Sequence, residues 1–85
     1  MNSLFEGLLL KGHIYLSRNQ FNEVQNLFRI YIKDNPKFPM GYYLLALSHY
    51  GNRDVYQAKA ALAEATKLNP KWDEARLLAA DIYIR

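Results

Sequence analysis

The chain has 85 residues, of which 51% are hydrophobic and 22% charged, and its formal net charge is +3 at pH 7. This length suits one small domain, and the balance of apolar and charged residues excludes an intrinsically disordered chain. The apolar runs are shorter than the roughly 20 residues of a membrane-spanning helix, so we expect no membrane insertion. There is no cysteine, which excludes disulfides. No signal-peptide pattern follows Met1, so we expect no export leader, and the compartment stays open.

The spacing of apolar residues predicts helices separated by short polar turns. Ser3 and Glu6 form a capping box, which opens a first helix over about residues 3–17. A second helix is expected over about 21–33, where apolar residues recur every three or four positions. Pro36 ends it, because proline disfavours helical geometry in the preceding residue and cannot donate to the hydrogen-bond ladder.

Three more helices are expected in the second half of the chain. The third, over about 40–50, should stop at Gly51-Asn52, where glycine would supply a left-handed cap. The fourth, over about 55–68, carries small residues on one face and closes at Asn69-Pro70. The fifth covers about 73–84. With no strand signal, the sequence predicts an all-α array of about five helices.

A fixed period runs through these helices, since Asn35-Pro36-Lys37-Phe38 is echoed by Asn69-Pro70-Lys71-Trp72, and 69 − 35 = 34. Other columns at the same period are Gly7 and Gly41; Leu10, Leu44 and Leu78; Gly12, Ala46 and Ala80; and Tyr15, His49 and Tyr83. A fixed period of this size indicates that one unit stacks on copies of itself. We therefore expect one domain over 1–85, with repeats at about 5–38 and 39–72 and a half repeat at about 73–85.

The columns also predict which residues form the core. Small residues at Gly12, Ala46 and Ala80 should let neighbouring helices approach closely. Further core positions are expected at Tyr15, Phe28, Tyr42, Ala58, Leu62 and Ala65. His49 falls in the tyrosine column, so we expect a packed imidazole there.

These residues resemble the tetratricopeptide repeat, a 34-residue helix–turn–helix unit with characteristic large, small and aromatic positions and a closing proline. The matching residues are Leu8, Gly12, Tyr15, Val24, Phe28, Tyr31 and Pro36 in the first unit, and Tyr42, Leu45, Ala46, His49, Ala58, Leu62, Ala65 and Pro70 in the second. The chain departs from the pattern at Lys11, Tyr31 and Arg76. The resemblance implies a right-handed α-solenoid of antiparallel helix pairs, with two full repeats and the first helix of a third.

In this family the first helices of successive repeats line a concave groove that holds a peptide or a helix. The resemblance therefore implies a non-catalytic protein–protein interaction module with a partner-binding groove. We call its predicted residues the groove set, namely Leu9, His13, Met40, Tyr43, Leu47, Tyr50, Leu77 and Asp81. Within each helix they recur every three or four residues, on a face offset from the small-residue column.

Two alternatives remain for this chain. Apolar residues crowd both terminal helices, for example Leu9 and Leu10 in the first and Ile82 and Ile84 in the last, which leaves self-association as a second function. Single-stranded RNA binding is more distant, because the predicted groove carries acids and no lysine to neutralise phosphate.

The sequence predicts no catalytic, cofactor or metal site. His13 and His49 lie one repeat apart, without the spacing of a metal site or a catalytic triad, and there is no glycine-rich phosphate loop. A carboxylate clamp for acidic C-terminal tails, known in the family, is not expected either. The matching positions hold Leu9, His13, Leu44, Glu74 and Leu78.

Overall fold

The computed structural model describes the backbone of residues 3–84 and the side chains of residues 6–84. Its five helices are α1 (Ser3–Ser17), α2 (Phe21–Asp34), α3 (Pro39–Gly51), α4 (Val55–Leu68) and α5 (Asp73–Ile84). The predicted helix bounds are confirmed to within one residue. The described residues contain no strand, so the all-α prediction is also confirmed. The capping box at Ser3 depends on a side chain outside the described ones.

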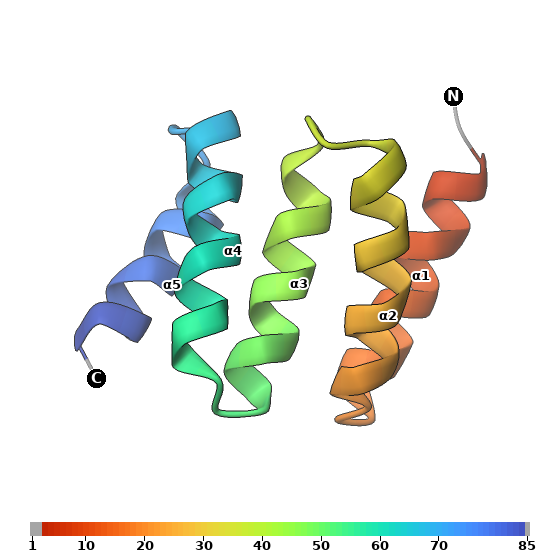
Figure 1. Cartoon of the computed structure of the whole chain (residues 1–85), viewed down its shortest axis with the longest axis horizontal. Coiled ribbons are helices and arrows are strands. Elements are labelled where there is room, and N and C mark those ends of the chain that lie inside the picture. The colour runs from red at the N-terminus through yellow and green to blue at the C-terminus, as the bar shows by residue number, and fades with distance from the viewer. Residues whose placement is uncertain (1–2, 85) are drawn as a thin grey trace.

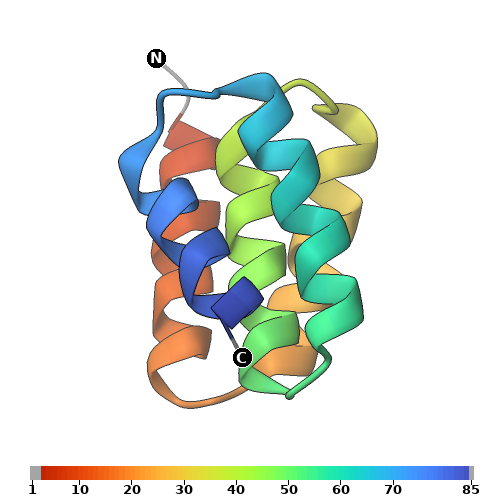
Figure 2. The same ribbon diagram turned by 90° about the vertical axis from the view of Figure 1, so that its left-hand side faces the viewer.

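Consecutive helices pack against one another along the chain, forming a row with α3 at its centre (Figure 1). Helices α1 and α5 stand at the two ends of this row, each partly behind its neighbour. Seen from the end in Figure 2, α1 and α5 lie on one side of the molecule, α2 and α4 on the other, and α3 between them. Helices α1 and α5 therefore share a side that α2 and α4 do not, and α3 lies between the two pairs.

Two turns of the structure have the same geometry at the period of the sequence. The turns after α1 and after α3 each contain one residue with positive φ, Asn19 at 57° and Arg53 at 64°, and 53 − 19 = 34. The turn hydrogen bonds recur in step, since Gln20 N–H to Tyr15 O and Asp54 N–H to His49 O are both 2.8 Å. Asn19 and Arg53 differ in chemistry, so the shared turn geometry comes from the helix pairs that they join.

The predicted left-handed cap at Gly51 is wrong. Gly51 is the last residue of α3, no glycine in the described chain has a positive φ, and the left-handed residue is Arg53. Position 51 requires glycine because of a close contact between helices. A Cβ there would overlap the ring of Phe21 at the start of α2, so the two helices could not approach as they do.

The core consists of two clusters of buried side chains. Val24, Phe28, Tyr31 and Leu44 join α2 to α3. Ala46, Ala58, Ala61, Leu62, Ala75 and Ile82 join α3, α4 and α5. Tyr43 packs against both clusters and so links the two halves of the molecule.

The small-residue column is buried at two of its three positions. A Cβ on Gly12 would lie 2.6 Å from Cε2 of Phe28, and Ala46 is completely buried. The prediction for Ala80 is wrong, because Ala80 is exposed. Gly12 is covered by Phe28 from the following helix. Among the described residues, no helix follows α5 to cover Ala80 in the same way.

Two predicted core tyrosines are only half-buried. Tyr15 lies beside the cluster around Phe28, and Tyr42 donates its hydroxyl to the carbonyl of Pro36 at 3.0 Å. The Tyr15 ring therefore covers the core from its edge, and the hydroxyl of Tyr42 reaches the α2–α3 connection.

Tyr31, which departs from the family pattern, is accommodated by a glycine on the facing helix. A Cβ on Gly41 would lie 3.3 Å from the ring of Tyr31 and 3.1 Å from Cγ1 of Ile32. One period later the same positions hold Ala65 and Ala75, both completely buried. The second unit thus has two small residues where the first has a large residue facing glycine.

Candidate interaction surface

Four residues of the groove set gather around the first core cluster. Leu9 from α1, together with Met40, Tyr43 and Leu47 from α3, is half-buried, and each packs against the cluster of Val24, Phe28, Tyr31 and Leu44. The structure therefore brings the α1 and α3 parts of the set to the same cluster. Each of these side chains has one part in the core and another part accessible to solvent.

Contacts between α3 and the α5 region fix two more residues of the set. The hydroxyl of Tyr50 donates to the carboxylate of Asp81 near the end of α5. The ring of Tyr43 lies 4.8 Å from that of Trp72, with the two planes tilted by 44°. Burial raises the pKa of the Tyr43 hydroxyl, and the nearby Glu74 carboxylate raises it further.

His13 and Leu77 are the groove-set residues with the least packing. His13 is exposed on α1. Leu77 is 71% exposed and borders a shallow hollow of about 470 Å³ that Asp73 and Arg76 also line. Arg76 Nη1 lies 4.0 Å from Asp73 Oδ1 across one helical turn, so the walls of this hollow carry paired charges.

The groove set omitted Trp72, although this side chain packs directly on one of its members. The repeated Asn-Pro-Lys-aromatic motif of the sequence could have identified Trp72. Trp72 closes the second Asn-Pro-Lys-aromatic echo, and its counterpart Phe38 likewise makes a ring contact, with Tyr31 at 6.0 Å. The aromatic that follows each Asn-Pro turn therefore packs on a tyrosine of a neighbouring helix.

Charge is distributed unevenly between the two sides of the molecule. Helix α3 contains no lysine, arginine, aspartate or glutamate. The described part of α5 carries Asp73, Glu74 and Asp81 against Arg76 alone. Helices α2 and α4 carry four basic residues, Arg29, Lys33, Lys59 and Lys67, and three acidic residues, Glu23, Asp34 and Glu64. The α3–α5 surface is consequently apolar with acidic residues beside it.

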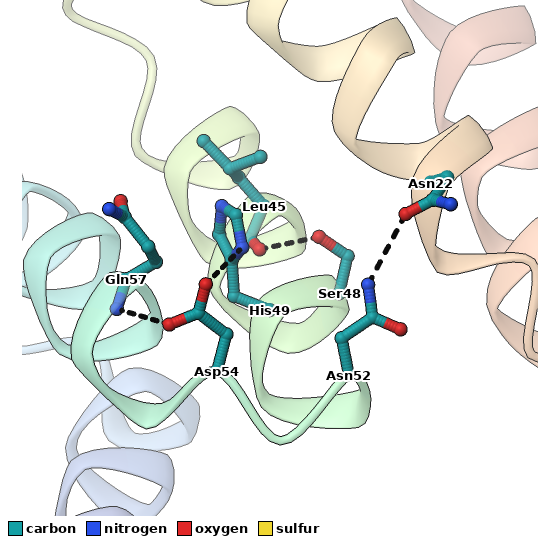
Figure 3. A network of polar contacts seen from close by, with 7 residues as sticks. All are labelled: Asn22, Leu45, Ser48, His49, Asn52, Asp54 and Gln57. Atoms are coloured by element: carbon teal, nitrogen blue, oxygen red, sulfur yellow. Dashed lines mark hydrogen bonds and ion pairs between the residues drawn. The ribbon is translucent and has the colours of Figure 1, made fainter.

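His49 lies in a polar network at the junction of α2, α3 and α4 (Figure 3). It is only 6% exposed, and its Nδ1 lies 4.0 Å from Oδ2 of Asp54. The other oxygen of Asp54 accepts the Gln57 N–H at 3.2 Å and so caps α4. The pKa of His49 is lowered, mainly by burial and also by the positive charge of Arg29, while the carboxylate of Asp54 opposes this shift.

This network has the contacts of a structural junction. Nearby, the amide of Asn52 donates to Oδ1 of Asn22 at 3.3 Å, which ties the end of α3 to the start of α2. No group of three or more His, Asp or Glu residues placed to hold a metal ion occurs among residues 6–84. The packed imidazole predicted for His49 is confirmed by its burial.

No protein-family model matches the chain, and comparisons with curated proteins and with solved structures gave no significant match. The resemblance to the tetratricopeptide repeat accordingly depends on the residues quoted from the sequence. Within the described residues, none of the helices has both the length and the apolar character needed to cross a bilayer.

Proposed function

We propose that this chain is a non-catalytic protein–protein interaction module of the tetratricopeptide-repeat type, a right-handed solenoid of antiparallel helix pairs. The recurrence of turn geometry at Asn19 and Arg53 supports the repeat assignment. The partner is a peptide or a helix, and it lies along α1, α3 and α5. No residue is assigned a catalytic, cofactor-binding or metal-binding role.

The observation that carries this proposal is the uncharged surface of α3. Met40, Tyr43, Leu47 and Tyr50 are each half-buried, so part of each side chain faces solvent on a helix with no charged residue to solvate it. Tyrosine and methionine supply large, adaptable contacts and are over-represented at recognition sites. An apolar strip beside acidic residues is the surface expected for binding an amphipathic segment.

The proposal is tested by selecting random 12-residue peptides that bind the purified protein from a displayed library. A selected peptide should bind the Leu77→Asp variant roughly tenfold more weakly, because a charged side chain replaces the exposed leucine that an apolar residue of the peptide would contact. The matched control is Ile30→Asp on α2, since Ile30 is 69% exposed and Leu77 71%. Equal losses in the two variants, or no selected peptide at all, would contradict the proposal.

Tyr43 is less suited to this test than Leu77, because its ring packs against both core clusters and against Trp72. Tyr43→Ala would reduce the stability of the fold together with any binding, so its effect could not be assigned. Leu77 belongs to neither core cluster, and its substitution tests binding with little change in stability.

Self-association is the second candidate function, and the exposed faces of the terminal helices favour it. On α1, Leu10 and Ile14 are 64% and 41% exposed, one helical turn apart. Tyr83 and Ile84 are exposed at the end of α5. Sedimentation velocity over a concentration series tests this, and Leu10→Glu with Ile14→Glu should abolish any dimer. A strict monomer at millimolar concentration would refute self-association.

Single-stranded RNA binding has no comparable support, because the lysines and arginines of the helices lie on α1, α2, α4 and α5 with none on α3. Fluorescence anisotropy with a labelled single strand should show no saturable binding at physiological salt. Tight, salt-dependent binding would reverse this assignment.

A further inference from the structure

Two aromatic rings and a carboxylate come together where α3 meets the start of α5. Tyr43 and Trp72 are each half-buried, and their ring centroids are 4.8 Å apart. Glu74 follows Trp72 closely in the chain, lies in the first turn of α5 and is exposed. Leu77 lies one helical turn after Glu74, so it is on the same face of α5.

No positively charged side chain of the described chain is paired with this group. Among the described residues, a cation–π contact lies elsewhere, where Lys59 Nζ stands 4.7 Å from the ring centroid of Tyr83. Arg76, the cation of α5 among residues 73–84, is paired with Asp73 at 4.0 Å. Glu74 makes no ion pair with any residue between 6 and 84.

A carboxylate in the first turn of a helix interacts favourably with the helix dipole, which is a sufficient reason for an acid at this position. The dipole does not account for the aromatic pair beside it. Aromatic ring faces carry negative potential and attract ammonium and guanidinium groups. An adjacent carboxylate adds a charge-assisted hydrogen bond, and guanidinium can stack on a ring while its N–H groups bond to the acid.

We propose that Tyr43, Trp72 and Glu74 form a subsite for a lysine or arginine side chain of the partner, whose apolar residues lie along α3 and on Leu77. This inference rests on the proposed function and names the chemistry of its ligand. Charge complementarity identifies the occupant, because α3 has no charge and the described part of α5 carries three acids against one arginine. The partner is therefore a basic, amphipathic segment, and an acidic segment of equal hydrophobicity is rejected.

Trp72 is the single tryptophan of the chain, so its fluorescence reports directly on this subsite. The probes are three synthetic amphipathic helices of equal length, with leucine on one face and lysine, glutamate or glutamine on the other. The lysine peptide should shift the Trp72 emission saturably. The glutamate peptide should bind at least roughly tenfold more weakly, and added salt should reduce this difference.

Two charge-neutralising variants separate the subsite from the overall charge of the protein. Glu74→Gln should weaken binding of the lysine peptide by roughly tenfold and leave binding of the glutamine peptide unchanged. Glu64→Gln, at an exposed acid on α4, makes the same change in net charge and should have little effect. Equal effects of the two substitutions on the lysine peptide would overturn the proposal, as would equal binding of the lysine and glutamate peptides.

Failure of this inference differs from failure of the proposed function. If library-selected peptides lose affinity with Leu77→Asp but not with Glu74→Gln, the groove binds its partner and the cation subsite is refuted. If neither selected nor designed peptides bind, both proposals are refuted.

Discussion

Replacing Gly12 by alanine should destabilise the protein, although alanine is the better helix former. In a helix interior, alanine is favoured over glycine by about 1 kcal/mol. At position 12, however, the new Cβ would lie 2.6 and 2.9 Å from two ring carbons of Phe28, well inside the normal contact distance of about 3.5–4.0 Å. Phe28 is completely buried, so its ring can move away from position 12 only by displacing other core atoms.

Overpacking of this kind costs about 1–3 kcal/mol, and this contact is tight, so we expect a net loss of about 1–2 kcal/mol for Gly12→Ala. The matched control is Gly7→Ala in the same helix. Nothing lies within 4 Å of a Cβ at Gly7. There the helix propensity acts alone, and the substitution should stabilise the protein by up to about 1 kcal/mol.

The second unit indicates how the overlap at position 12 can be relieved. Its equivalent pair is Ala46 and Leu62, both buried in one cluster. Phe28→Leu alone should cost about 1–2 kcal/mol, because it leaves a gap beside Gly12. The double variant reproduces the pair of the second unit, and it should be more stable than the sum of the single changes predicts by about 1–2 kcal/mol.

Urea denaturation followed by circular dichroism in the far ultraviolet measures each free energy of unfolding. If the changes in unfolding free energy of the two single variants add up to that of the double variant, positions 12 and 28 do not share one contact. Stabilisation by Gly12→Ala equal to that by Gly7→Ala would show that α1 and α2 do not approach as closely as described.

Three further substitutions test individual contacts. Ala46→Leu should overpack the completely buried site between α3 and α4 and cost about 1–3 kcal/mol in urea denaturation; an unchanged midpoint would contradict that burial. Gln20→Asp should stabilise α2 by about 0.5–2 kcal/mol in thermal melts, because Gln20 provides no side-chain cap and its Oε1 is buried without a partner, whereas Asp54 caps α4 from the equivalent position. If Gln20→Asp does not raise the melting temperature while Asp54→Ala lowers it, the two turns are not equivalent. Burial lowers the pKa of His49 below its ordinary value of 6.5, so the unfolded chain takes up the proton first and stability should fall as the pH drops below about 6.5. His49→Tyr, the residue type at the equivalent Tyr15, should flatten this part of the profile as the solution is acidified; the same slope in both proteins would assign it to other groups.

The helices were predictable because their boundaries are set locally. Pro36 and Pro70 end helices through their own backbone geometry, and apolar spacing needs only a few turns of sequence to be recognised. The period of the sequence extended this local information to packing. It placed Gly12 and Ala46 against neighbouring helices, where the structure buries both.

The errors arose where a residue depends on a distant partner. Glycine at position 51 fits either a left-handed cap or a close contact, and only the position of Phe21, in the preceding helix, decides between them. Ala80 has the right size for a helix contact, but burial requires a second helix opposite it. The pairing of Tyr43 with Trp72 links residues that are far apart in the chain, and residue spacing within one helix could not reveal it.

The location of partner binding on α1, α3 and α5 is still a prediction, and chemical-shift mapping with a library-selected peptide tests it most directly. In ¹⁵N-labelled protein, the largest shifts should occur at His13, Met40, Leu47 and Leu77, with saturation at the peptide's dissociation constant. Amides of exposed residues on α2 and α4, such as Ile30 and Glu64, should stay unchanged. Shifts concentrated on α2 and α4, with α3 unaffected, would contradict the account.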